Sequence, residues 1–273
     1  MEMDRFYVQP GEKPLDHIRT DGGFASIFRT IGCVGDSLSS GEFEGLDEEG
    51  NKTYHDLYEY SWGQCLARMT GSRVYNFSRG GMTAREYCDS WAGEHGYWGR
   101  EYACQAYILA LGGNDLYGRG GMEVGEIGDI CREDYRENKP TFAGYYGQII
   151  QRLQEISPHA KFFLVTMPRE EKQTRKAREQ GDGHASLLRE MAGFFPNTYV
   201  IDLRRYAPVY DQKFYDDFYL GGHMQPCGYV FTAYMMVSYI DYLVRANKRD
   251  FRMVGLVGTP YEEEMVRMLE QEK

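Results

Sequence analysis

The sequence lacks the features of several large protein classes. Its most apolar stretch, residues 229–244, is interrupted by polar side chains, so we expect no membrane-spanning segment. Lys and Arg (31) are outnumbered by Asp and Glu (41), and the net charge of -10 argues against nucleic acid or an anionic membrane as partner. Residues 1–20 include acidic side chains and no apolar core, unlike a secretory signal, so we expect a cytoplasmic protein.

Motifs for metals, disulfides and phosphates are also missing. The six cysteines are scattered, with no Cys-x-x-Cys pair, which favours reduced thiols over a zinc or disulfide framework. The glycine-rich residues 118–128 lack Gly-Lys-Ser/Thr, and residues 45–51 lack the spacing of a calcium loop. We therefore expect neither a metal nor an organic cofactor.

Strand-like and helix-like patterns alternate along the chain. Apolar runs typical of buried strands occupy residues 28–34, 72–78, 105–113, 160–168 and 198–203. Helical patterns occupy residues 58–71, 83–92, 141–158, 170–195 and 226–247. This alternation predicts an α/β fold, a three-layer α/β/α sandwich with a central parallel sheet.

No linker or repeat divides the chain, so residues 1–273 are interpreted as one domain. Residues 1–25 are expected to form an N-terminal arm, and residues 249–273 a C-terminal extension. The long segments 38–56 and 116–140 are expected to form walls or lids of a substrate cleft, since long loops at a rigid sheet edge often carry specificity.

Polar residues that suit acyl transfer follow the predicted strands. Ligands of parallel sheets bind beyond the carboxyl ends of the strands, which places these residues in one crevice. Ser37 offers a hydroxyl nucleophile and His223 a base. Backbone N–H groups at Ser37 and Gly81, with the side-chain amide of Asn114, offer donors to a developing oxyanion.

Four segments resemble, in order, the motif blocks of the SGNH or GDSL-type esterase and lipase (acylhydrolase) superfamily. They are GDSLSSGE (35–42), NFSRGGMT (76–83), LGGND (111–115) and GGHMQPCGY (221–229). The resemblance implies a flavodoxin-like SGNH hydrolase fold, with Ser37 as nucleophile and His223 as general base and then acid. It also implies that Gly81 and Asn114 bind the oxyanion and that Asp36 holds the nucleophile loop.

The sequence departs from this family at one position. The family pattern Asp-x-x-His has Leu220 in place of the aspartate that orients His223. Three interpretations stay open: Asp216 or Asp217 reaches the ring, a backbone carbonyl holds it in a Ser–His dyad, or much of the activity is lost. Loss of this acid in serine proteases costs about four orders of magnitude in turnover.

The most favoured function is therefore hydrolysis of carboxylic esters through a Ser37 acyl-enzyme. Short acyl esters, such as acetyl groups on a carbohydrate or another small molecule, are the expected substrates. A non-catalytic or weakly active ligand-binding protein and an acyltransferase with the same residues are the alternatives. An aromatic group near the crevice segments fits either sugar stacking or core packing: Trp62, Trp91, Tyr97, Trp98 and Tyr117.

Overall fold

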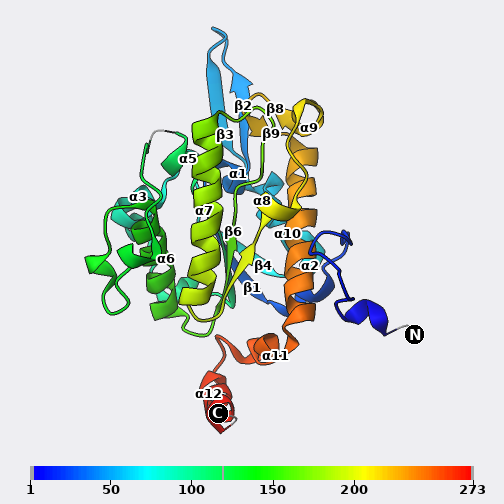
Figure 1. Cartoon of the computed structure of the whole chain (residues 1–273), viewed down its shortest axis with the longest axis vertical. Helices are drawn as coiled ribbons and strands as arrows, with labels where there is room; N and C mark the ends of the chain where they lie inside the picture. The colour runs from blue at the N-terminus through cyan, green and yellow to red at the C-terminus, as the bar shows by residue number, and fades with distance from the viewer. Residues whose placement is uncertain (1–2, 119, 272–273) are drawn as a thin grey trace.

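A computed structural model describes residues 3–118 and 120–271 and has a parallel five-stranded sheet at its centre (Figure 1). The strand order is β4-β1-β5-β6-β7, the order of flavodoxin-like doubly wound sheets. The strands are β1 (Thr30–Gly35), β4 (Arg73–Asn76), β5 (Ala106–Ala110), β6 (Lys161–Val165) and β7 (Thr198–Ile201). All five lie within or beside the predicted runs, and the α/β prediction is confirmed.

Helices cover both faces of this sheet. The longer ones are α2 (Trp62–Thr70), α6 (Phe142–Ile156), α7 (Arg175–Phe194), α10 (Pro226–Ala246) and α12 (Glu262–Gln271). Short ones are α1 (Ser37–Ser40), α3 (Ala84–Glu86), α4 (Ala92–Glu94), α5 (Gly113–Leu116), α8 (Leu203–Tyr206), α9 (Gln212–Phe218) and α11 (Lys248–Phe251). The helix expected over 83–92 is interrupted by a π-helical turn, Tyr87–Trp91.

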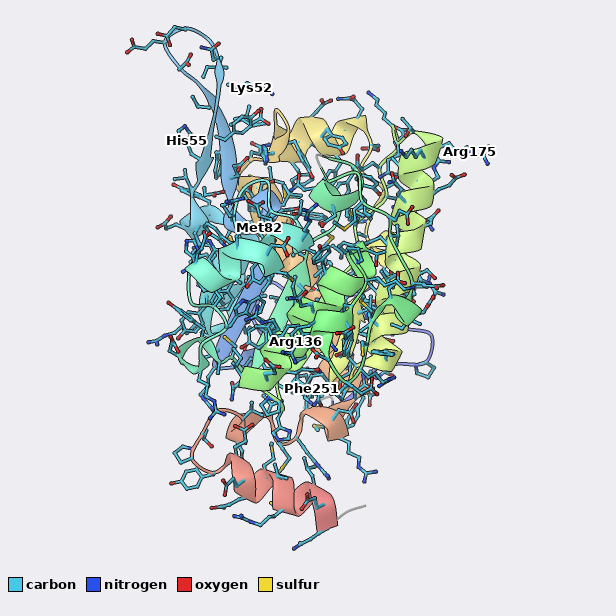
Figure 2. The ribbon with its side chains drawn as sticks, turned by 90° about the vertical axis from the view of Figure 1, so that its left-hand side faces the viewer. Lys52, His55, Met82, Arg136, Arg175 and Phe251 are labelled. Atoms are coloured by element: carbon cyan, nitrogen blue, oxygen red, sulfur yellow. The ribbon has the colours of Figure 1, made fainter. Side chains whose placement is uncertain are left out.

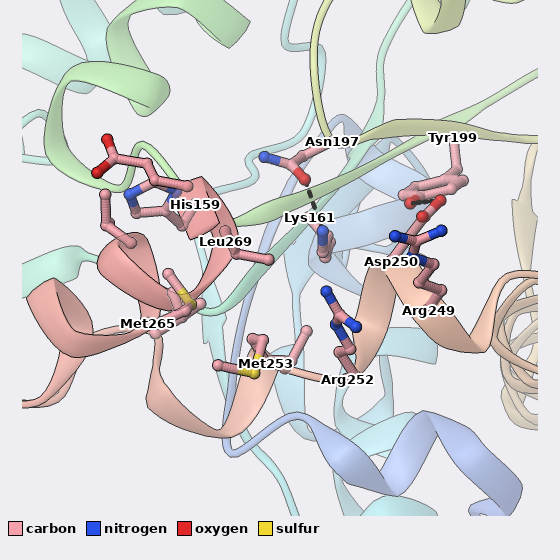
Figure 3. A pocket seen from close by; sticks show the side chains of 14 residues that line it. His159, Lys161, Asn197, Tyr199, Arg249, Asp250, Arg252, Met253, Met265 and Leu269 are labelled. Carbon is pink, nitrogen blue, oxygen red and sulfur yellow. Dashed lines mark hydrogen bonds between the residues drawn. The ribbon is translucent and has the colours of Figure 1, made fainter. Parts of the chain in front are cut away.

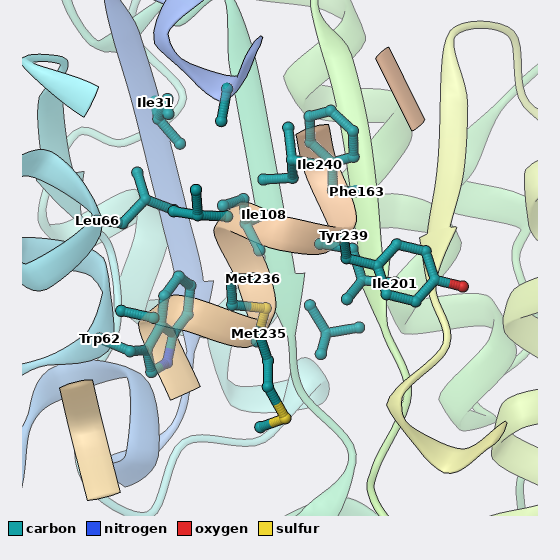
Figure 4. Close-up of a cluster of buried hydrophobic side chains, with 14 of the residues drawn as sticks. Ile31, Trp62, Leu66, Ile108, Phe163, Ile201, Met235, Met236, Tyr239 and Ile240 are labelled. Atoms are coloured by element: carbon teal, nitrogen blue, oxygen red, sulfur yellow. The ribbon is translucent and has the colours of Figure 1, made fainter. Parts of the chain in front are cut away.

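Each face of the sheet has its own hydrophobic core. Helices α2 and α10 pack on one face, where Ile31, Ile108 and Phe163 of the strands meet Trp62 and Met236 (Figure 4). Helices α6 and α7 cover the other face around a second buried cluster. Strands buried on both sides explain why their sequences are continuously apolar rather than alternating.

Two short antiparallel hairpins lie outside the central sheet. The first joins β2 (Glu42–Leu46) to β3 (Lys52–Asp56) and extends away from the body of the molecule (Figures 1 and 2). The second joins β8 (Tyr219–Leu220) to β9 (His223–Met224), just before α10. The segment 38–56, expected to be a loop, is therefore a helix turn followed by a hairpin.

The arm at the start of the chain is attached to α10 through buried charges. Arg245 donates to the Glu12 carboxylate at 2.6 Å and to Asp241 at 2.8 Å. The backbone N–H of Phe24 also donates to Asp241, at 2.8 Å. Within the described residues no helix combines the length and apolar character needed to cross a membrane.

Candidate active site

Ser37 begins a helix at the carboxyl end of β1. The Asp36 carboxylate accepts a hydrogen bond from the Leu38 N–H at 3.1 Å and so caps the first turn of α1. Burial raises the pKa of Asp36 to about 6. Asp36 thus has the loop-holding position that the family resemblance implied for it.

Two of the three expected oxyanion donors, Gly81 and Asn114, lie on neighbouring segments. The Asn114 side-chain amide donates to the Met82 carbonyl at 3.2 Å, which fixes α5 against the turn that contains Gly81. Gly81 adopts a positive φ of 71°, a conformation that disfavours side chains. A second bond between these segments runs from the Ala84 N–H to the buried Asp115 carboxylate, at 2.8 Å.

The β8–β9 hairpin brings His223 to the same edge of the sheet, where β9 contacts α1 and β2. Its ring lies between two carboxylates of the other hairpin. Nδ1 is 3.0 Å from an oxygen of Glu44, and Nε2 is 3.0 Å from an oxygen of Glu42. Within the described part of the chain, the Ser37 hydroxyl makes no hydrogen bond in this conformation.

Glu44 takes the place expected of an aspartate. Besides His223, it accepts a hydrogen bond from the Gly222 N–H at 2.6 Å and pairs with Lys52 at 2.7 Å. The bond from Lys52, helped by those from His223 and Gly222, lowers the pKa of Glu44 to about 2. Glu44 is therefore charged at neutral pH and can orient the imidazole.

Of the three interpretations left open by the sequence, contact of Asp216 or Asp217 with the His223 ring is not seen in this structure. Both lie on α9, where Asp216 accepts from Gln212 at 2.7 Å and Asp217 pairs with Lys213, each one turn away. Leu220, at the family's aspartate position, is 60% exposed. The carboxylate beside Nδ1 of His223 comes instead from the hairpin after Ser37.

The glycines at the tip of the β8–β9 hairpin allow Glu44 to approach. A Cβ atom on Gly221 would lie 2.3 Å from one Glu44 oxygen, and one on Gly222 would lie 2.6 Å from the other. Gly221 also has a positive φ of 69°. The Gly-Gly pair therefore fits the carboxylate against the backbone next to His223.

A second carboxyl group lies on the Nε2 side of the ring. Glu42 is buried, and its carboxyl group lies beside Asp56, which accepts hydrogen bonds from the Ser40 hydroxyl and from the Gly80 N–H. Burial, reinforced by the neighbouring acids, raises the pKa of Glu42. Glu42 and Asp56 thus connect His223 to the turn that contains Gly80 and Gly81.

Sequence reasoning missed Glu42 and Glu44. The alternation Glu-Phe-Glu over residues 42–44 was a signal for a strand with both acids on one face. No group of three His, Cys, Asp or Glu side chains that could hold a metal ion occurs among the residues described.

Comparison with known proteins identifies the family. The model of the GDSL-like Lipase/Acylhydrolase family matches residues 33–230, more than half of the chain. The chain belongs to this family. Among curated proteins, no match was found.

Solved structures share the GDSL-like fold at low sequence identity. A family two carbohydrate esterase from Clostridium thermocellum, in complex with cellohexaose, is 14% identical with a TM-score of 0.57; the match covers 79% of this chain and 64% of the esterase. An acetyl xylan esterase is 18% identical with a TM-score of 0.50, covering 77% of this chain and 99% of that one. A possible lipase from Chitinophaga pinensis DSM 2588 is 15% identical with a TM-score of 0.50, covering 80% and 99%.

Proposed function

We propose that this GDSL-family protein is a serine esterase that cleaves short acyl esters, with acetyl esters of a carbohydrate as its substrate class. The observation that carries this proposal is the 3.0 Å contact between Glu44 and Nδ1 of His223. It supplies the orienting carboxylate whose absence at Leu220 was the main argument against an active enzyme. A carboxylate at Nδ1 holds the ring and stabilises the imidazolium that forms during proton transfer.

In this mechanism the Ser37 oxygen attacks the ester carbonyl carbon while its proton moves to Nε2 of His223. The oxyanion accepts hydrogen bonds from the N–H groups of Ser37 and Gly81 and from the Asn114 amide. The imidazolium then protonates the departing alkoxide, leaving an acyl group on Ser37. Water attacks this acyl group with His223 again as base, which releases the acid and regenerates the hydroxyl.

A small cavity supports a short acyl group. It has a volume of about 180 Å³ and is lined by Asp36, Leu38 and Gly113, the neighbours of Ser37 and Asn114, together with side chains beyond β6 such as Met167. Such a volume accommodates an acetyl group easily, whereas a long lipid chain would need more space.

The rim of the site supports a sugar substrate. The Tyr54 ring lies 5.9 Å from the His223 ring, edge to face, and Tyr54 is 54% exposed. An exposed aromatic face beside the base suits stacking on a sugar ring. Trp62, by contrast, is buried in the core, so the core-packing interpretation holds for that residue.

One observation favours a weakly active ligand-binding protein as the second candidate. Nε2 of His223, the atom that must accept the Ser37 proton, contacts Glu42 in this structure. Turnover requires this contact to open, and a protein in which it stays closed would bind ligands without cleaving them. An acyltransferase would use the same residues with another acceptor than water.

The test is hydrolysis of p-nitrophenyl acetate and of an acetylated xylo-oligosaccharide by the wild type, Ser37→Ala and Ser186→Ala. Ser186 is an exposed serine of α7 and serves as the matched control. We expect both activities to vanish in Ser37→Ala and to be unchanged in Ser186→Ala. Equal background rates in all three proteins would overturn the proposal and favour the ligand-binding candidate.

A further inference from the structure

A second, larger cavity lies at the opposite end of the sheet from Ser37. It has a volume of about 500 Å³ and is formed by the first residues of β6 and β7 together with the C-terminal segment 249–270 (Figure 3). The matched family region ends at residue 230, so the helices α11 and α12 that close this cavity lie beyond it. None of the candidate catalytic residues lines this cavity, so it is separate from the site proposed for ester cleavage.

A buried cation forms one wall of the cavity. Lys161 is 6% exposed, and its ammonium donates a hydrogen bond to the Asn197 side-chain oxygen at 2.6 Å (Figure 3). Among the described residues the ammonium forms no ion pair within 4.0 Å, although the Asp250 carboxylate attracts it from a greater distance, and the Phe251 ring lies 5.5 Å away. Asn197 takes one of its three N–H donors, and burying a charge that has no carboxylate in direct contact is costly.

The rest of the lining combines positive charge with apolar surface. Arg249 and Arg252 lie on the Lys161 side, and Met253, Met265 and Leu269 lie on the other (Figure 3). Two acids also line the cavity. Asp250 accepts a hydrogen bond from the Tyr199 hydroxyl at 3.1 Å, and Glu270 is an exposed residue of α12.

We propose that this cavity binds an amphipathic carboxylate, with its head group at Lys161 and its alkyl chain along Met253, Met265 and Leu269. A bound carboxylate would lie in direct contact with the buried ammonium, as no acid of the described residues does, and would form charge-assisted hydrogen bonds, which are stronger than neutral ones. The flexible thioethers and the leucine would take the chain out of water, as methionine does at other adaptable apolar surfaces. In a protein of net charge -10, an anion is attracted here only by local positive charge.

The probe is octanoate, whose binding is measured by titration calorimetry. Acetate, which has the carboxylate without the alkyl chain, and octanol, which has the chain without the carboxylate, are titrated as comparison ligands. We expect octanoate to bind at least about tenfold more tightly than either, since each lacks one half of the interaction. Lys161→Met should weaken octanoate binding by about tenfold or more, the cost of losing a charged hydrogen bond. The matched control is Lys176→Met, an exposed position on α7 away from the cavity.

Turnover of p-nitrophenyl acetate distinguishes this cavity from the Ser37 site, where a carboxylate product could also bind. We expect Lys161→Met to lose octanoate binding while its turnover matches that of the wild type. Octanoate affinity that is unchanged in Lys161→Met would overturn the proposal, because the ligand would then occupy another site. Equal affinity for octanol and octanoate would overturn it as well.

A second measurement needs no variant. Burial lowers the pKa of Lys161 to about 8, so part of the side chain is neutral at that pH. A bound carboxylate favours the ammonium, and binding at pH 8 should therefore take up protons. Titrations in two buffers of different ionisation enthalpy would show this uptake, and its absence would contradict a head group at Lys161.

Discussion

Glu44 and His223, 179 positions apart in the sequence, form a hydrogen-bonded pair at 3.0 Å in the candidate active site. The acid lies on the β2–β3 hairpin, directly after the nucleophile helix, and the base lies on a separate hairpin before α10. In the proposed mechanism the orienting carboxylate thus belongs to the same segment as the nucleophile rather than to the segment of the base. Glu44 thus places beside His223 a carboxylate that the exposed Leu220 lacks.

The first prediction concerns Glu44→Gln. The amide keeps the size of the side chain but removes the charge that stabilises the imidazolium, and it can hold the ring in the wrong tautomer. We expect kcat/KM for p-nitrophenyl acetate to fall by about two to four orders of magnitude, by analogy with loss of the acid in serine proteases. Glu49→Gln, at the exposed tip of the same hairpin, is the control and should match the wild type. A fall of less than threefold in Glu44→Gln would show that the ring is oriented by another group.

Glu42→Gln tests the contact at the other ring nitrogen. A neutral amide oxygen is a weaker acceptor than a carboxylate, so Nε2 would be released more readily towards Ser37. We expect kcat for p-nitrophenyl acetate to rise or to stay unchanged, in contrast to Glu44→Gln. If Glu42→Gln lost as much activity as Glu44→Gln, Glu42 would be a working partner of His223 rather than a competitor of Ser37.

Comparing Gly221→Ala with Gly50→Ala tests whether the close approach of Glu44 to the β8–β9 hairpin matters for activity, beyond the backbone strain that both substitutions cause. Its Cβ would overlap a Glu44 oxygen, whereas a Cβ on Gly50, which has a similar positive φ of 82°, meets nothing within 4 Å. Both alanines strain the backbone, each at a cost of about 1 kcal/mol. We expect activity to fall in Gly221→Ala and to persist in Gly50→Ala, measured with the same ester. Equal activity in the two variants would mean that Glu44 moves without consequence.

Asp115→Asn should change how stability depends on pH. Burial raises the pKa of Asp115 to about 7, and one of its oxygens has no hydrogen-bond partner. At pH values below the unfolded pKa of about 4, the carboxyl group is neutral in both states and has no electrostatic effect on stability. As the pH rises from about 4 through 7, the carboxyl group ionises in the unfolded state before it ionises in the folded state. This ionisation stabilises the unfolded state, so the free energy of unfolding falls.

The asparagine variant cannot ionise and keeps an acceptor for the Ala84 N–H. We therefore expect it to be more stable than the wild type at pH 8, by an upper limit of about 4 kcal/mol, with a much smaller difference at pH 4.5. Denaturant unfolding at the two pH values measures this, with exposed Asp89→Asn as control. A difference that did not grow with pH would show that Asp115 is not held neutral.

The positions of the motif residues could be predicted because strand ends are visible in the sequence. Continuous apolar runs marked β1 and β5, and the rule for parallel sheets placed Ser37 and Asn114 at a common edge. The structure brings Asn114 to the Gly81 turn through the Met82 carbonyl. The β2–β3 hairpin was not predicted, because its five-residue strands are polar and lie outside the central sheet.

The sequence by itself determined the class of fold, the order of the motif blocks and the candidates for nucleophile and base, since these depend on local patterns and strand direction. Only the tertiary structure decided which acids lie beside His223. That choice depends on where two hairpins meet, and neither Glu44 nor Asp217 carries a local signal of its distance from the ring. The burial of Lys161 also depends on the tertiary structure, because a lysine at the start of a strand becomes buried only when the C-terminal helices pack over it.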